Sequence, residues 1–376
     1  MTLSKKIAKK LPKKSSKRLL KILLPRRMHN VLGACAIVAL SSLCGNVQAS
    51  DKFDIEAVKT KYNSIDYVYT SIPERGYNYY KVADNAYYIH NEFDSMVFFI
   101  TDIGVVVYDA RPELTPGVLD LIPKLTDKKI THVIYSHHHR DHAEGMHLYV
   151  ESVLMAKDAK IIAQRETEEF LKIAHEDLPA ERANMRPMPN LVWDDEYVLE
   201  TGGLRLEFKN YSRNWHSHDD AVVYAPKQKI LFATDTFHAK SAPWIHFGEA
   251  SDPMMTWKIP QILLDDYPDF EFVITGHEKI VATHEDLEQY RDLIADMQNI
   301  MWEVVKSDGF HATMKEAGLR YKDGSEWWNY REGIDLAAEL CAAKFVERWA
   351  PKVRNASLNA KENFSMMFMQ NMILNP

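Results

Sequence analysis

The stretch YSHHHRDHAEG, residues 135–145, places four histidines and one aspartate within six positions. It follows KITHVIY, residues 129–135, which has the pattern of a short buried strand. Residues two apart in an extended chain face the same side, so His137 and His139 can face one cation. The chain must then turn, so Asp141 and His142 can face a second cation nearby. Neutral imidazole and carboxylate are ligands that suit zinc.

Further candidate ligands follow later strand patterns. The segment NWHSHDDAVVYAP offers either His216 or His218, LFATDTF offers Asp235, and ITGHE offers His277. His137, His139 and His216 would complete one site. Asp141, His142 and His277 would complete the other. Asp235 can bridge the two sites, which places the cations roughly 3.5–4 Å apart.

The surrounding sequence predicts a mixed α/β fold. Aromatic and β-branched runs at 95–101 and 105–109 are joined by a turn that contains glycine, which predicts a hairpin. Helical spacing covers 114–125 and 166–174, and 152–162 is expected to hold a helix and then a strand. Further strands are expected at 204–208, 221–224, 230–233 and 270–275. From residue 284 onward the pattern is helical, which predicts an α/β domain at 50–285 and a helical extension at 286–376.

The ordered ligand set resembles the metallo-β-lactamase superfamily over residues 85–284. The HxHxDH motif is present at 137–142, and His216 fits the superfamily's next histidine better than His218 because a strand and Pro226 follow it. The resemblance implies an αββα sandwich, two zinc ions, and a supporting role for Asp109 behind the metal loop. Glu144 departs from the usual DHxGG continuation. Asp235 stands where β-lactamases with this motif carry Cys or Ser, which favours the glyoxalase II and lactonase branch.

The implied activity is hydrolysis of an ester, thioester, lactone or amide in a small molecule by a hydroxide between two zinc ions. Asp141 would orient that hydroxide and take up its proton. Iron or manganese could replace zinc. The alternatives are an iron-dependent oxidoreductase on the same scaffold and a non-catalytic metal-binding protein. Trp244 and His246 are candidates for the substrate pocket, with ordinary packing of an aromatic loop as the alternative.

The first 49 residues have the pattern of a secretory signal. Eleven Lys and Arg without an acid precede a short apolar run, and a small-x-small site ends at Ala49. Cleavage there predicts a periplasmic or secreted protein without a stable membrane span. Losing those eleven charges would lower the formal net charge from −7 to −18, which argues against a nucleic-acid partner. Cys341 would then be the one remaining cysteine, and it is expected to be a buried helix residue. The C-terminal helices could support a homo-oligomer.

Overall fold

The computed structural model describes residues 72–374 except 212, 279–280 and 321–325. All described residues belong to one compact unit of the chain. The predicted secretory signal therefore lies outside the described residues. None of the helices in the described ranges is long and apolar enough to cross a membrane.

The first of two sheets contains seven strands in sequence order. They are β1 (Asn78–Ala83), β2 (Ala86–His90), β3 (Ser95–Ile100), β4 (Val105–Tyr108), β5 (Ile130–Ile134), β6 (Met155–Gln164) and β7 (Leu191–Trp193). The strands β1 to β4 pair antiparallel, and β4 to β7 pair parallel. The predicted hairpin at 95–101 and 105–109 is present as β3 and β4.

The second sheet contains six strands in the order β13-β12-β11-β10-β9-β8. They are β8 (Glu196–Thr201), β9 (Leu204–Lys209), β10 (Val222–Ala225), β11 (Ile230–Phe232), β12 (Phe272–Ile274) and β13 (Ala282–Thr283). All neighbours are antiparallel except β11 and β12, which run parallel. As a result β11 and β12 end at the same edge of this sheet.

Side chains that alternate between the two faces of each strand form one apolar core between the sheets and another under the outer helices. In β3, Val97 and Phe99 join the core that also contains Phe232 of the second sheet. Met96 and Phe98 point to the opposite face, into a core shared with the helices on that side. Because side chains alternate with a period of two, one strand contributes to both cores. The predicted αββα sandwich is confirmed.

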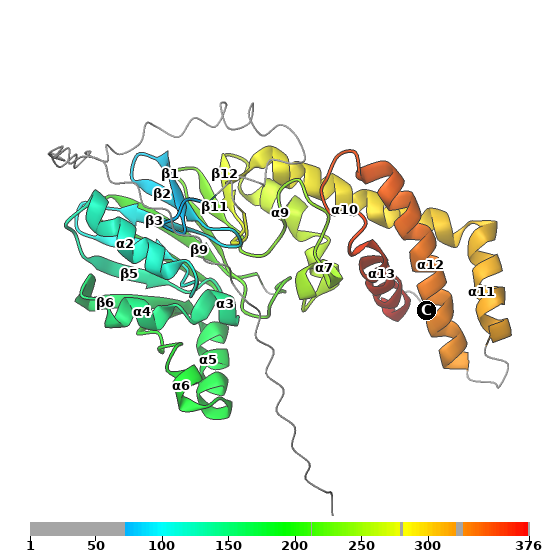
Figure 1. The fold of residues 1–376 in the computed structure, drawn as a ribbon, viewed down its shortest axis with the longest axis horizontal. Coiled ribbons are helices and arrows are strands. Elements are labelled where there is room, and N and C mark those ends of the chain that lie inside the picture. The colour runs from blue at the N-terminus through cyan, green and yellow to red at the C-terminus, as the bar shows by residue number, and fades with distance from the viewer. Residues whose placement is uncertain (1–71, 212, 279–280, 321–325, 375–376) are drawn as a thin grey trace, which may run out of the picture. The chain divides into compact units, whose positions relative to one another are not determined.

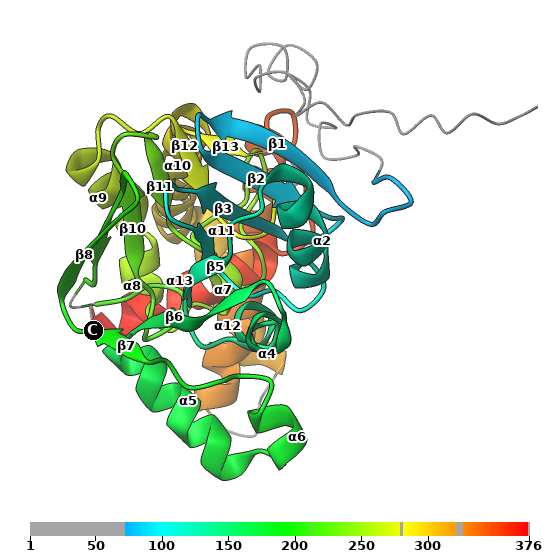
Figure 2. The same ribbon diagram turned by 90° about the vertical axis from the view of Figure 1, so that its left-hand side faces the viewer.

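Helices cover the outer face of each sheet (Figure 1). The first sheet is covered by α2 (Thr115–Leu125), α4 (Met146–Glu151) and α5 (Arg165–Asp177), and the second by α9 (Ile259–Asp266) and α10 (His284–Val305). Short helices occur at α3 (Arg140–Ala143), α6 (Ala180–Ala183), α7 (His246–Glu249) and α8 (Pro253–Thr256). Figure 2 shows α5 and α6 side by side, with α5 next to β7.

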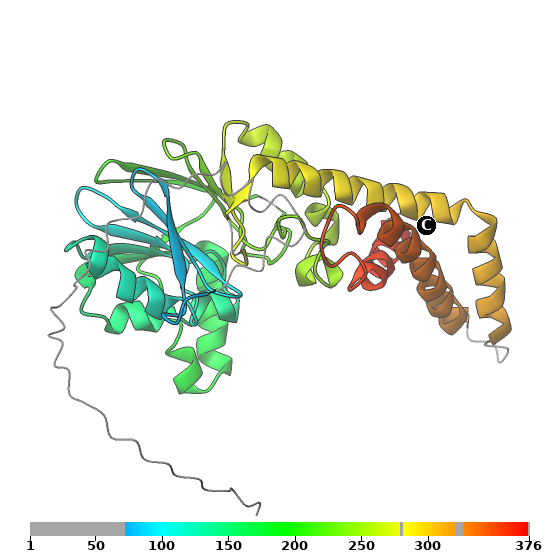
Figure 3. The same cartoon turned by 45° about the horizontal axis from the view of Figure 1, so that its top comes forward.

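The C-terminal part of the chain is helical, as predicted. Thr283 and Asp286 form a reciprocal capping box that starts α10, and Figure 3 shows α10 leading from the second sheet to the later helices. Those helices are α11 (Asp308–Arg320), α12 (Glu326–Trp349) and α13 (Ala360–Leu374). Phe345 and Phe364 share one continuous core with Leu231 of the second sheet. The extension therefore packs onto the sandwich through a common apolar core.

Two details differ from the sequence-based expectation. The helix expected at the start of 152–162 lies earlier, as α4, and 155–164 is one long strand. The strands β1, β7, β8 and β13 were not expected. The edge strand β8 alternates exposed and less exposed positions, and its sequence EYVLET carries two acids, so its hydrophobic signal is weak.

Candidate metal centre

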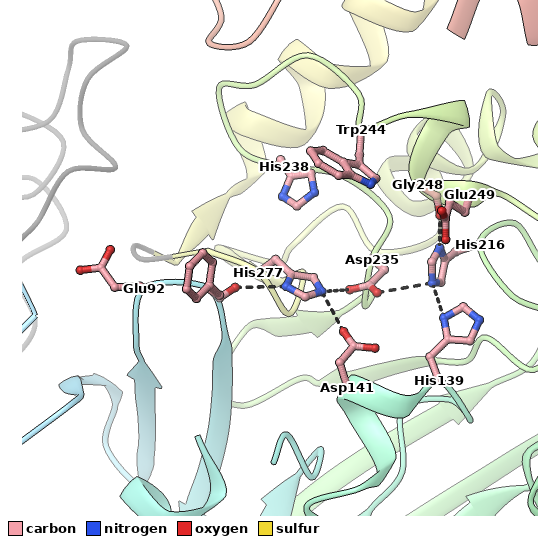
Figure 4. A pocket seen from close by; sticks show the side chains of 11 residues that line it. Glu92, His139, Asp141, His216, Asp235, His238, Trp244, Gly248, Glu249 and His277 are labelled. Carbon is pink, nitrogen blue, oxygen red and sulfur yellow. Dashed lines mark hydrogen bonds and ion pairs between the residues drawn. The ribbon is translucent and has the colours of Figure 1, made fainter. Parts of the chain in front are cut away.

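The predicted ligands come from both sheets and meet at the ends of their strands. His137 and His139 follow β5, and Asp235 and His277 follow β11 and β12. His216 lies in the loop between β9 and β10. Figure 4 shows four of these side chains, all except His137, gathered at the bottom of one cavity.

The first group consists of ring nitrogens of His137, His139 and His216, which lie within 4.8 Å of one another. Nδ1 of His137 is 3.0 Å from the Ser136 hydroxyl, and Nδ1 of His216 is 2.8 Å from the Gly248 carbonyl. A proton on each Nδ1 satisfies these bonds and leaves the Nε2 lone pair facing the group. Nε2 of His137 is buried and has no hydrogen-bond partner among the described residues. These three nitrogens fit a cation such as zinc.

Burial favours the neutral imidazole at two histidines of the first group, His137 and His139. It lowers the pKa of His137 well below the usual value, with His142 and His216 adding to the effect. Burial and the neighbouring His216 lower the pKa of His139 from 6.5 to about 4. Neutral imidazole is the form that binds a metal ion, so the lone pairs are available at neutral pH.

The second group consists of the other predicted ligands, Asp141, His142, Asp235 and His277. Their ligand atoms also lie within 4.8 Å of one another. Nδ1 of His142 is 2.6 Å from Oδ2 of Asp109, and Nδ1 of His277 is 3.1 Å from the carbonyl oxygen of Phe93. With protons on these Nδ1 atoms, both Nε2 lone pairs face the interior of the group. The donor set by itself suits a divalent cation.

The guanidinium of Arg111 lies inside the second group. Its Nη2 is 2.5 Å from Nε2 of His142 and 3.1 Å from Nε2 of His277. The same atom is 3.6 Å from Oδ1 of Asp235, and Nη1 is 3.6 Å from Oδ2 of Asp141. A protein cation therefore lies within reach of all four residues that were predicted to hold the second metal ion.

Arg111 was not identified from the sequence. Its side chain is fully buried, and Nη1 forms an ion pair with Asp94 at 2.6 Å. Burial opposes its charge, but Asp235, Asp109 and Asp94 outweigh burial and raise its pKa. The only local signal is its place two residues after Asp109 in VVVYDAR, at the end of a strand. Nothing in that segment indicates that an arginine is buried there.

Asp109 supports one histidine of each group. Its Oδ2 accepts from His142, and its Oδ1 accepts from the hydroxyl of Ser136 at 3.1 Å. That hydroxyl in turn faces Nδ1 of His137. Asp109 has a φ of 83°, a conformation that turns the chain sharply at the end of β4. The structure thus places Asp109 directly behind the ligands, orienting their rings.

The other histidines of the two motifs lie away from the ligand groups. Nδ1 of His138 is 2.7 Å from Asp219, and its ring stacks on Phe170 with centroids 4.1 Å apart. His218 also faces Phe170, at 6.3 Å between ring centroids. Of the two alternatives in NWHSHDD, the structure brings His216, and not His218, to the first group.

A cavity of about 520 Å³ opens above the ligands. Besides ligand residues, its walls are formed by Glu92, Phe93, His238, Trp244, Gly248 and Glu249. Asp141 projects into it with a side chain that is 43% exposed. Of the two candidate pocket residues, Trp244 lies in the lining (Figure 4), whereas His246 is not among the residues that line the cavity.

The helical extension borders a smaller hollow beside this cavity. The hollow, of about 180 Å³, shares His238, Trp244 and His277 with the larger one. Its other side is formed by residues between α12 and α13, including Arg354 and Leu358. A substrate bound over the ligands could therefore extend toward the C-terminal helices.

This chain is similar in sequence to one known protein family and to individual members of it. The sequence model of the metallo-beta-lactamase superfamily matches residues 91–299. A metallo-beta-lactamase type 2 of Bacillus cereus is 23% identical over 258 residues, covering 66% of this chain and 92% of the relative. Its counterpart from Bacillus sp. (strain 170) is 24% identical, covering 67% and 90%. A solved metallo-beta-lactamase from Pontibacter korlensis aligns with 58% of this chain and 99% of its own, at 19% identity and a TM-score of 0.47.

Proposed function

The chain belongs to the metallo-β-lactamase superfamily, and we propose that it is a metal-dependent hydrolase of a small-molecule ester, thioester, lactone or amide. One observation carries the proposal: the imidazoles of His137, His139 and His216 converge beneath an open cavity. Two of the rings are held by protein acceptors, so their lone pairs are positioned in advance. Such preorganisation is typical of a metal site that works on a substrate.

A zinc ion held by these three histidines would polarise a substrate carbonyl and lower the pKa of a water molecule toward about 7. Two carboxylates of the chain lie near the attacking water. Asp141 is half-exposed in the cavity lining, and we propose that it orients that water. Burial raises the pKa of its carboxyl, but His142, His277 and Arg111 outweigh burial and lower the pKa, so Asp141 is a weak proton acceptor while these partners are in place. Oδ2 of Asp235 faces the first group, 3.4 Å from Nε2 of His216. Two carboxylates therefore border the site where the bond is cleaved.

The choice among bonds rests on Asp235 and on the relatives. An aspartate in place of Cys or Ser supports the glyoxalase II and lactonase branch. The two Bacillus relatives are named as β-lactamases, and a β-lactam is a cyclic amide. We therefore include β-lactams among the substrates to be tested, after lactones and thioesters.

The test is a substrate panel with the purified protein. Lactones, thioesters, phosphodiesters and β-lactams are assayed with and without a chelator, and the metal content is measured by elemental emission. We expect chelator-sensitive hydrolysis of at least one class, restored by zinc. Chelator-sensitive oxidation with bound iron would favour an oxidoreductase instead. Bound metal without any turnover across the panel would contradict the hydrolase proposal.

We also propose that the protein is exported and cleaved near Ala49. The support is the basic, apolar and small-x-small order of residues 1–49. N-terminal sequencing of the protein recovered from the cell envelope or medium tests this. A mature N-terminus near residue 50 is expected, and a retained Met1 in an exported protein would contradict the cleavage.

A further inference from the structure

We propose that Arg111 is a built-in cation that replaces the second metal ion, so that the protein binds one metal ion per chain at the three-histidine group. The inference rests on the proposed function, because it assumes that His137, His139 and His216 hold a metal. It goes beyond that function by assigning a different occupant to the second group. Arg111 acts here as a positioning residue, since it is buried and does not line the cavity.

The first reason is the space beside the ring nitrogens. Nη2 of Arg111 lies 2.5 Å from Nε2 and 3.0 Å from Nδ1 of His142, and 3.1 Å from Nε2 of His277. Nδ1 of each histidine also faces an acceptor, Asp109 or the carbonyl of Phe93, so Nε2 is the nitrogen left for a metal ion. The position that such an ion would take next to both Nε2 atoms is occupied by the guanidinium.

The second reason is charge. The guanidinium is surrounded by four carboxylates, which lie within 3.6 Å of it: Asp94, Asp109, Asp141 and Asp235. A buried positive charge persists only when it is paired in this way. A divalent cation added to the same group would stand next to a fixed like charge in a water-poor interior, where repulsion is strong. Arg111 therefore neutralises part of the acidic charge and opposes a second metal at the same time.

The third reason is that the guanidinium has no room to move aside. Asp94 holds Nη1 at 2.6 Å, and the side chain is fully buried. On the opposite side, Nη2 approaches the backbone of Gly276 so closely that a Cβ there would lie 2.5 Å from it. Gly276 also has a φ of 91°, which favours glycine. The loop before His277 is thus shaped around the arginine.

The arrangement separates the roles of the two groups. The three-histidine group holds the metal, and the second group fixes Asp141 and Asp235 beside it through Arg111. Asp141 keeps its place at the cavity because Nη1 of Arg111 lies 3.6 Å from its carboxylate. The hydrolysis proposed above then depends on one metal ion and two arginine-held carboxylates.

The test is a metal count that does not depend on activity. The full chain is stripped with a chelator and titrated with zinc, and bound zinc is counted by native mass spectrometry and elemental emission. We expect one zinc per wild-type chain and two per chain of Arg111→Ala, in which the second group is vacated. Arg140→Ala removes an exposed arginine at the start of α3 and should still bind one.

Cobalt provides a second readout of the same question. A single high-spin cobalt is expected in the wild type, and an exchange-coupled pair in Arg111→Ala. Two zinc ions in the folded wild type would overturn the inference and leave the proposed function standing. Wild type without zinc would instead overturn the proposed function. A folded Arg111→Ala that stops at one zinc would also overturn the role of Arg111, and if that variant does not fold, the wild-type count decides.

Discussion

At the scale of single residues, two histidines two positions apart have different surroundings. His216 is nearly buried, with its ring between the Gly248 carbonyl and Nδ1 of His139. His218 faces Phe170, outside the ligand groups. Only Ser217 separates the two histidines, so the difference arises from where the loop between β9 and β10 is held. Asp220 holds it there by accepting from the backbone N–H of His216 at 2.7 Å.

The pair makes a matched test of the metal group. His216→Ala removes one of three nitrogen ligands, and we expect it to lose bound zinc and at least about 100-fold in turnover, at the upper end of what support residues cost. His218→Ala should keep its zinc and stay within about threefold of wild type. Elemental emission and steady-state kinetics measure both. If His216→Ala kept its zinc and His218→Ala lost it, then His218 and not His216 would be the metal ligand.

Cys341 illustrates how burial alone sets reactivity. It lies in α12, and burial raises the pKa of its thiol from 9.0 to about 12, with Lys344 opposing the shift only in part. The thiol is therefore protonated in the folded protein at pH 8, as expected for a residue without a nucleophilic role. Since the unfolded thiol ionises near 9, this group reduces stability as pH rises above 9 toward 12.

The prediction concerns alkylation by iodoacetamide at pH 8. Cys341 should remain unmodified in the folded protein and react within minutes in denaturant, as followed by peptide mapping with mass spectrometry. Fast modification of Cys341 without unfolding would show that the thiol is accessible and ionised, contrary to its burial.

At the scale of elements, the residue that departs from the family motif has a structural explanation. Glu144 follows α3 and is buried. Its carboxylate accepts from Arg182 at 2.7 and 2.9 Å and from Arg186 at 3.0 Å. These arginines lie in α6 and directly after it. Glu144 therefore ties the HxHxDH loop to the α5–α6 segment.

Glu144→Gln tests that tie. Because charge-assisted hydrogen bonds are lost, we expect the free energy of unfolding to fall by about 1.5–3 kcal/mol. Protease cleavage within 178–189 should become faster, while zinc content stays unchanged. Denaturant unfolding and limited proteolysis measure these effects. Glu181→Gln, an exposed acid in α6, is the control and should behave as wild type. Equal cleavage of the two variants would count against the tie.

At the scale of the whole molecule, the helical extension holds one wall of the cavity. Asn363 of α13 is buried, donates to the carbonyl of Pro243 at 3.1 Å and accepts from the N–H of Phe247 at 3.0 Å. Between these contacts lies Trp244 of the cavity lining, and Gly248, which orients His216, follows directly. The extension is thus linked to the metal group through one loop.

Asn363→Ala would leave two buried backbone groups without partners, which costs about 1–3 kcal/mol each. We expect lower thermal stability and a KM increased severalfold for whichever panel substrate is hydrolysed, with a smaller change in kcat. Met369→Ala, an exposed position on the same helix, should change neither. Unchanged KM in Asn363→Ala would mean that the extension supports the fold without shaping the cavity.

Local patterns in the sequence predicted the mixed α/β fold, its helical C-terminal part and a set of candidate ligands. The period of two in the β3 and β4 runs and the helical spacing after residue 284 are set by which faces are buried, and burial is encoded residue by residue. Ligands at strand ends follow from the same reasoning, because strands that end at one edge bring their next residues together. His137, His139 and Asp235 were identified in this way.

Only the tertiary structure decided what occupies the second group. Arg111 reads as an ordinary polar residue after a strand, and its burial depends on carboxylates from separate segments, among them Asp94, Asp141 and Asp235. The positions of Glu144 and Asn363 likewise depend on partners about 40 and 120 residues away. Pairing of buried charges and polar groups is a long-range property, since each group is tolerated only where distant residues supply its partners. The hydrophobic pattern within one segment does not indicate which distant residues will be its partners.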